Sequence, residues 1–195
     1  MTHHAIIVIG AGPSGIGAAI RLAQAGYTDV VVLEKSDRLG GTWRDNTYPG
    51  CACDVPSALY SYSFAPNREW SRLFAGQAEI QAYLERVARE HGVPERVRFR
   101  TELIGARWQP AVRRWRLETS AGFYTCDVLI GASGPWHQPR MPSVPGDDSF
   151  PGHRFHSARW DHGFDLRGKR VAVIGTGASA IQFVPAIQPD VARLH

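Results

Sequence analysis

Hydrophobic residues near the start of the chain form two short continuous runs on either side of a helical pattern. No polar residue interrupts Ala5–Ile9 or Val30–Leu33, and such runs are typical of strands buried on both faces of a parallel sheet. Between them, small and apolar residues recur at helical spacing from Ile16 to Ala23, and this pattern ends near Gly26. The chain therefore begins with a predicted strand–helix–strand unit of the α/β class.

Further along, the pattern predicts a long loop, a helix and a group of strands. Residues 40–75 are rich in glycine, proline and aromatic residues without a clear period, so we expect a long ordered loop. Residues 77–91 place their apolar residues on one face of a helix. Strand patterns follow at 96–100, 103–108, 113–119 and 123–130, and the last ends in a turn at Gly131–Gly134.

A second strand-and-helix pattern begins at Arg170–Ile174, after a proline-rich stretch. The sequence therefore predicts a first domain over 1–134, a linker over 135–169 and the start of a second domain over 170–195. We expect a strand that begins near Val191 to have little sequence left with which to pair. An exposed apolar surface is then expected from Ile174, Ile181, Phe183 and Val184.

Two glycine turns stand where a predicted strand meets a predicted helix. Gly10–Gly15 reads G-x-G-x-x-G, in which the first glycine makes a tight turn, the second admits a pyrophosphate and the third allows close helix packing. Glu34 ends the next strand, where a carboxylate accepts hydrogen bonds from ribose and repels a 2′-phosphate, so FAD or NAD fits this turn and NADP does not. The alternative is a glycine turn that binds nothing. Gly175–Ala180 reads G-x-G-x-x-A, and alanine as the third residue is common where NADP binds.

Two longer motifs accompany these turns. Gly40–Asp54 reads G-G-x-W-x-x-x-x-Y-P-G-x-x-x-D, and Phe150–Asp161 reads F-x-G-x-x-x-H-x-x-x-W-D. Together they resemble the fingerprints of Baeyer–Villiger monooxygenases. The resemblance spans nearly the whole chain but only the first part of a family member. It implies an α/β fold: a Rossmann-like FAD-binding domain with a parallel sheet in three layers and an added small β-meander. The start of a second Rossmann-like, NADP-binding unit is expected to follow.

The resemblance also implies roles for individual residues. Physically, paired glycines permit a close approach to a planar ring, and Trp43 and Tyr60 can wall off an apolar pocket. Residues placed at FAD are Gly10, Gly12, Ser14, Gly15, Glu34, Gly41, Thr42, Trp43, Asp54 and Tyr60, with Leu103 as a weaker candidate beside the adenine. Residues placed at NADP(H) are Ala52, Cys53, Asp54, Gly175, Thr176, Gly177, Ala178, Ser179 and Gln182.

Two residues have implied catalytic roles. Asp54 is expected beside a catalytic arginine that this chain does not contain, and His156 is expected to couple movement of the linker to NADP binding. The arginine that binds the 2′-phosphate is expected beyond His195, so the preference for NADP over NAD is implied by the resemblance alone.

The implied activity is an FAD- and NADPH-dependent insertion of one oxygen atom from O2 into a small ketone, which gives an ester or lactone. We expect the chain alone to be inactive. Two alternatives stay open. One is a flavin monooxygenase that oxygenates nitrogen or sulfur, whose relatives usually lack the final Trp160-Asp161. The other is a non-catalytic FAD-binding remnant.

Composition excludes several other classes. The net charge is +4, and the alternation of arginine with apolar residues over 96–100 predicts a solvated strand face and no nucleic-acid surface. Apolar runs are too short for a membrane span, and Ala5–Ile9 is too short for a signal peptide. The spacing of Cys51 and Cys53 is typical of neither a disulfide framework nor a zinc site, and Cys126 is expected in the core. This cysteine usage leads us to expect a cytoplasmic location. No metal is expected, and the oligomeric state is not predicted.

Overall fold

The computed structural model describes residues 1–135 and 137–195, and it divides into two compact units. The first unit contains residues 1–44 and 81–137, and the second contains residues 45–80 and 138–195. The loop that carries the Gly40–Asp54 motif therefore contributes to both units. The domain boundaries expected from the sequence stay a prediction.

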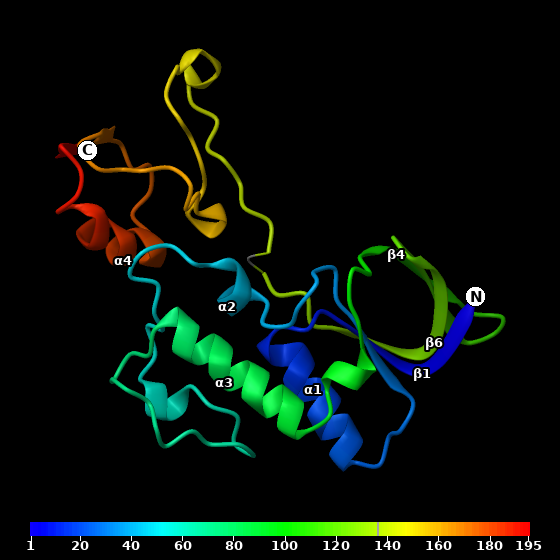
Figure 1. The fold of residues 1–195 in the computed structure, drawn as a ribbon. Coiled ribbons are helices and arrows are strands. Elements are labelled where there is room, and N and C mark those ends of the chain that lie inside the picture. The colour runs from blue at the N-terminus through cyan, green and yellow to red at the C-terminus, as the bar shows by residue number, and fades with distance from the viewer. Residues whose placement is uncertain (136) are drawn as a thin grey trace. The chain divides into compact units, whose positions relative to one another are not determined.

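The first unit contains one six-stranded mixed sheet in the order β3-β2-β1-β6-β5-β4 (Figure 1). The first four strands in this order run parallel to one another. The remaining two pairs, β6 with β5 and β5 with β4, are antiparallel. The strands are β1 (Thr2–Ile9), β2 (Val30–Leu33), β3 (Val97–Arg98), β4 (Leu103–Gln109), β5 (Arg114–Thr119) and β6 (Gly122–Gly131). The predicted meander is thus β4-β5-β6, and it shares β6 with the parallel sheet.

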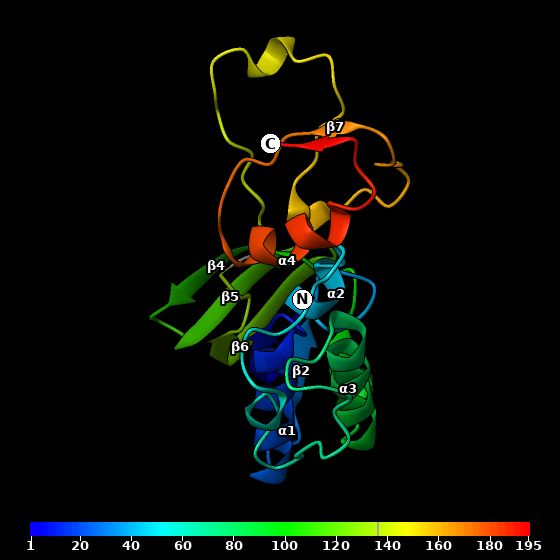
Figure 2. The same cartoon turned by 90° about the vertical axis from the view of Figure 1, so that its left-hand side faces the viewer.

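Each face of the parallel strands is covered. Ile7 and Val31 pack with Leu117 of β5 and Cys126 of β6 in one core cluster, so the meander covers that face. The alternate residues Ile6, Val8, Val30 and Val32 are also buried and face the other way. On this side lie α1 (Pro13–Gln24) and α3 (Gln77–Glu90), which run beside each other in both views (Figures 1 and 2). The predicted three-layer α/β fold is therefore confirmed.

Two local predictions were wrong in extent. The strand expected over 96–100 is only Val97–Arg98, because Pro94–Arg96 forms a 3-10 turn and Arg100 has a φ of +54° that leaves the extended region. The long loop over 40–75 contains a short helix, α2 (Thr42–Asp45), and a 3-10 turn at Ser57–Leu59. Periodicity cannot reveal such short elements.

The second unit contains the second predicted glycine turn and the helix that follows it. α4 covers Ala178–Ile187, and β7 (Arg170–Val171) pairs in parallel with β8 (Arg193–Leu194), so the last residues do find a partner strand. Further 3-10 turns lie at Asp147–Ser149 and Ser157–Arg159. The predicted apolar surface is only partly present. Ile174 and Ile181 are exposed and Val184 is half-buried, but Phe183 is buried because aromatic rings of its own unit cover it.

A buried carboxylate at the end of β2 ties several parts of the first unit together. Glu34 is 4% exposed, and its Oε2 atom accepts a hydrogen bond from the Ala11 N–H at 2.7 Å. Its Oε1 atom accepts hydrogen bonds from the Ser36 N–H at 2.9 Å and from Arg44 Nη1 at 3.1 Å. The same Nη1 atom donates to the Arg38 carbonyl at 2.7 Å. Glu34 therefore joins the first glycine turn to α2 through a buried ion pair.

Replacing Glu34 with glutamine is expected to lower the free energy of unfolding by about 3–5 kcal/mol, because the buried Arg44 guanidinium loses its counter-charge. The measurement is urea denaturation of the full-length protein freed of cofactor. The control is Glu90→Gln, which breaks the exposed Arg86–Glu90 ion pair and should cost less than about 1 kcal/mol. Similar losses for the two variants would contradict the central role of Glu34.

Candidate functional site

The first glycine turn contains two glycines that the fold itself requires. Gly10 has a φ of +98°, and a Cβ atom there would lie 2.7 Å from the Ala132 carbonyl oxygen. A Cβ atom on Gly15 would lie 1.8 Å from the Gly10 carbonyl oxygen, because the start of α1 packs directly on the end of β1. The turn after β6 therefore lies against the glycine turn.

Gly12 differs from its two neighbours in the motif. Its backbone is extended, with φ −78° and ψ −173°, and an added Cβ atom would come no closer than 3.5 Å to the Gly41 Cα atom. Gly12 is the N-cap of α1, where no side chain caps the helix and the first turn has no acidic residue. The protein interior does not explain a glycine here, whereas a phosphate group at the positive end of the helix dipole would.

The second motif touches the first through backbone atoms. Gly41 has a φ of +56°, and a Cβ atom there would lie 2.8 Å from the Gly12 Cα atom. The Gly40 N–H donates to the Ala11 carbonyl at 2.9 Å. The glycine pair thus has a packing role that sequence reasoning missed, since it was interpreted only as an approach to a planar ring.

The other predicted residues of the first unit have varied surroundings. Ser14 and Thr42 are exposed, whereas Trp43 is buried. Leu103 is half-buried and packs against the core cluster of the sheet. Glu34, expected to accept hydrogen bonds from ribose, already accepts three from protein donors. Its carboxylate is therefore part of the framework around the glycine turn.

In the second unit, the rest of the Gly40–Asp54 motif runs beside α4. The Gln182 carboxamide pairs with the backbone of Ala52: its Nε2 donates to the Ala52 carbonyl at 2.9 Å, and its Oε1 accepts from the Ala52 N–H at 3.3 Å. The Tyr48 hydroxyl also donates to Gln182 Oε1, at 2.9 Å. Cys53 is buried and Asp54 is exposed. Three residues predicted at NADP(H), Ala52, Cys53 and Gln182, therefore lie in one cluster.

Burial controls the ionisation of this cluster. Loss of solvent contact raises the pKa of Tyr48 to about 12, although a hydrogen bond with Ser179 opposes the shift. Burial also raises the pKa of the Cys51 and Cys53 thiols. At neutral pH the phenol is protonated and can donate, and both thiols stay protonated.

The second glycine turn is open. Gly175 has a φ of +120°, and an added Cβ atom on Gly175 or Gly177 would meet nothing within 4 Å. Gly177 is the N-cap of α4, with no side-chain cap and no acidic residue in the first turn. Thr176 and Ala178 are exposed, and Ser179 is half-buried. The N-terminus of α4 is therefore accessible to an anion within its own unit.

The Phe150–Asp161 motif folds into a small strap of the second unit. His156 Nδ1 accepts a hydrogen bond from the Ala158 N–H at 3.0 Å and so caps the turn at Ser157–Arg159. The Trp160 ring lies between the rings of Phe155 and Phe183, at centroid distances of 5.1 and 5.3 Å. The visible role of His156 is structural, and that of Trp160 is to dock the strap on α4.

Asp161, the last residue of this motif, holds the strap together. Its carboxylate accepts hydrogen bonds from His153 Nε2 at 2.8 Å and from the Gly163 N–H at 2.9 Å. These hydrogen bonds lower the pKa of Asp161. Tyr60 is half-buried and follows the turn at Ser57–Leu59.

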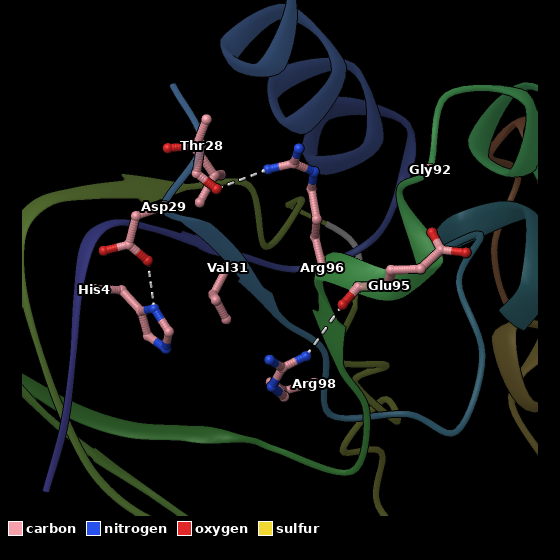
Figure 3. Close-up of a pocket in the computed structure, with 9 residues that line it drawn as sticks. His4, Thr28, Asp29, Val31, Gly92, Glu95, Arg96 and Arg98 are labelled. Carbon is pink, nitrogen blue, oxygen red and sulfur yellow. Dashed lines mark hydrogen bonds and ion pairs between the residues drawn. The ribbon is translucent and has the colours of Figure 1, made fainter. Parts of the chain in front are cut away.

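A surface hollow lies near the amino end of β2, at the end of the sheet away from the first glycine turn (Figure 3). Asp29, one of two acidic residues in its wall, accepts hydrogen bonds from His4 Nδ1 and from the Ala5 N–H, both at 2.7 Å, and these lower the pKa of Asp29. Arg96 and Arg98, also in its wall, donate to backbone carbonyls. Ligands of open parallel sheets bind at the carboxyl ends, so this hollow is not the candidate site.

The part of the chain that the structure describes contains neither a metal-binding group of side chains nor a membrane-spanning helix. Within residues 1–135 and 137–195, no three histidine, cysteine, aspartate or glutamate side chains are grouped in a way that could hold a metal ion. No helix in the same ranges has the length and apolar character required to span a bilayer. Cys51, Cys53 and Cys126 are buried free thiols.

Comparison with known proteins agrees with these motifs. Residues 7–186 match the family described as pyridine nucleotide-disulphide oxidoreductase. A Baeyer-Villiger monooxygenase of Streptomyces coelicolor is 58% identical over 192 residues, which is 98% of this chain and 37% of the relative. A protein of the same name from Pseudomonas aeruginosa is 49% identical over 193 residues, with the same coverage of 98% and 37%. The chain thus spans about 37% of the length of these curated relatives.

Solved structures give the same result. A cyclohexanone monooxygenase bound to epsilon-caprolactone aligns with a TM-score of 0.91 and 35% identity, over 100% of this chain and 39% of that one. An oxidized steroid monooxygenase bound to NADP aligns with a TM-score of 0.89 and 40% identity, over 99% and 38%. OTEMO in complex with FAD and NADP aligns with a TM-score of 0.90 and 39% identity, over 98% and 38%. The resemblance to Baeyer–Villiger monooxygenases is confirmed, and the chain belongs to the pyridine nucleotide-disulphide oxidoreductase family.

Proposed function

We propose that this chain is the N-terminal portion of a Baeyer–Villiger monooxygenase that uses FAD, NADPH and O2. The observation that carries the proposal is the pair of glycine turns, each of which opens a helix without a side-chain cap, together with both fingerprints of the family. In this proposal residues 1–134 form most of the FAD domain, 135–169 a linker and 170–195 the start of the NADP domain. The expected cytoplasmic location stays a prediction.

The residues of the first turn fit a dinucleotide. Gly12 leaves space that a Cβ atom would fill, and the amide groups at the start of α1 can donate to the two phosphates of FAD. The other residues proposed to contact FAD are Ser14, Thr42, Trp43, Asp54 and Tyr60, with Leu103 beside the adenine. Glu34 would add a ribose contact only by sharing a carboxylate that already accepts three hydrogen bonds.

The second turn fits NADP(H) for the same physical reason. Gly175 and Gly177 leave the start of α4 uncovered within its unit, and Ser179 lies in the first turn of the helix. When bound and reduced by NADPH, FAD would supply the chemistry with O2. In that chemistry one oxygen atom of O2 is inserted between the carbonyl carbon of a ketone and a neighbouring carbon atom. The protein binds and orients both cofactors. Asp54, which is exposed, is proposed to orient a catalytic arginine that lies outside these residues.

The proposed activity is tested with the full-length protein and a set of ketones, an amine and a sulfide. We expect NADPH oxidation that depends on the ketone, and ester or lactone products detected by gas chromatography. A protein that forms only N-oxides or sulfoxides would be an oxygenase of the related type. The absence of any product despite bound FAD would indicate a non-catalytic flavoprotein.

Substituting Gly12 with alanine is expected to leave the fold intact but to remove most of the bound FAD, because the new methyl group occupies phosphate space. The measurement is the ratio of flavin to protein absorbance after purification, with circular dichroism to check the fold. Retention of the full flavin content would show that the turn is misassigned.

Three controls accompany the Gly12 variant. Gly105→Ala places its methyl group where nothing lies within 4 Å and should change neither fold nor flavin content. Gly15→Ala should prevent folding, since the Gly10 carbonyl oxygen lies 1.8 Å from the new Cβ atom. Gly177→Ala should retain FAD but slow its reduction by NADPH.

Replacing His156 with alanine is expected to slow NADPH-dependent turnover at least about tenfold while FAD content stays the same, because the strap belongs to the unit of the second turn. Stopped-flow reduction of the flavin measures the change. His156→Asn provides the control, because asparagine can replace the lost cap of the 3-10 turn. Full recovery in the asparagine variant would mean that His156 acts only as a cap.

A further inference from the structure

The second half of the Gly40–Asp54 motif presents alternate residues to α4. Tyr48, Gly50 and Ala52 are two residues apart, and each contacts Gln182. A Cβ atom added to Gly50, whose φ is +77°, would lie 2.7 Å from the Gln182 carbonyl oxygen and 3.3 Å from the Ala186 Cβ atom. Only glycine allows this approach, so the Tyr-Pro-Gly part of the motif is shaped to lie on the helix.

Gln182 contacts this segment with both ends of its carboxamide. The two hydrogen bonds to Ala52 copy the pairing of a neighbouring β-strand, and the Tyr48 hydroxyl supplies a third. All three hydrogen bonds are consistent with one orientation of the amide, in which Nε2 donates one and Oε1 accepts two. The Tyr48 ring also packs edge-on against Phe183, at a centroid distance of 6.0 Å. The side chain of Gln182 is therefore occupied by protein groups.

The first half of the same motif has different partners. Gly40 and Gly41 pack on the first glycine turn, and Arg44 pairs with Glu34. The boundary between the two compact units falls after Arg44. One continuous fingerprint is thus anchored by two separate sets of contacts, one in each unit.

We propose that Gln182 is a positioning residue that holds Ala52–Asp54 against the first turns of α4 and so fixes the place where the nicotinamide cofactor is received. This proposal rests on the proposed function, which assigns both the second glycine turn and Ala52–Asp54 to NADP(H). Gln182 acts through Ala52 and Tyr48 and makes no essential contact with the cofactor itself. In this proposal, the second glycine turn binds NADP(H) in a productive position only when Ala52–Asp54 lies against α4.

The cysteines provide a direct measurement of the contact. Cys51 and Cys53 flank Ala52 and are buried, while Cys126 lies in β6 of the other unit and is fully buried. In full-length holoenzyme, iodoacetamide labelling followed by peptide mass spectrometry reports the three thiols separately. In Gln182→Ala we expect Cys51 and Cys53 to be labelled at least about tenfold faster, because the variant loses all three hydrogen bonds of the carboxamide, with Cys126 unchanged.

The kinetic measurement separates positioning from direct binding. In Gln182→Ala, the limiting rate of flavin reduction by NADPH should fall about tenfold, while the Kd for NADPH changes less than about threefold. Gln188→Ala is the matched control, since Gln188 is exposed just after α4, and it should behave as wild type in both assays. Tyr48→Phe removes one of the three hydrogen bonds and should give a smaller increase in the labelling of Cys53. Cys51 is left out of this comparison because its thiol also hydrogen-bonds with Tyr48.

Three results would overturn the proposal. Unchanged labelling of Cys51 and Cys53 in Gln182→Ala would show that the carboxamide does not hold the segment. A higher Kd with an unchanged reduction rate would make Gln182 a direct cofactor ligand. If Gln182→Ala also exposes Cys126, Tyr48→Phe decides, and labelling of Cys53 at the wild-type rate in that variant would count against the proposal. Failure of NADPH to reduce the wild-type flavin would refute the proposed function, whereas the labelling result would still test the contact.

Discussion

The buried carboxylate of Glu34 is the interaction on which the rest of the first unit depends. A charge with so little solvent contact is tolerated only when it is paired and fully hydrogen-bonded, and Arg44 with the Ala11 and Ser36 amides meets this requirement. The backbone of Glu34 adds two more bonds, from its N–H to the Arg98 carbonyl and from the Thr101 N–H to its carbonyl. The end of β2, the glycine turn, α2 and the segment after β3 are therefore fixed by one residue.

A second consequence concerns how a sequence motif relates to a structural unit. The Gly40–Asp54 motif looks like a single cofactor loop, yet its glycines pack on the first glycine turn, and its Tyr48–Ala52 portion packs on α4. Its residues are thus constrained by two sets of contacts at once. Glycine is required for close backbone approach at two places in the segment, Gly41 and Gly50.

The strap of the second unit follows the same logic. Its aromatic residues pack on one another and on Phe183, its aspartate pairs with His153, and its histidine caps a short turn. His156, Trp160 and Asp161 of the Phe150–Asp161 motif therefore each have a local structural reason, whereas Phe150 is exposed.

The sequence alone determined the order of the elements, the α/β class and the places of both glycine turns, because hydrophobic periodicity and glycine conformation are local properties. It also determined that Gly10 and Gly15 are needed for the turn and for helix packing. Only the tertiary structure decided that Glu34 pairs with Arg44, that Gly41 packs on Gly12 and that Gln182 pairs with Ala52. These contacts join residues from 10 to 130 positions apart, as in the Arg44–Glu34 and Gln182–Ala52 pairs. Which polar group meets which partner over such separations depends on how the folded chain brings them together, and no local pattern records it.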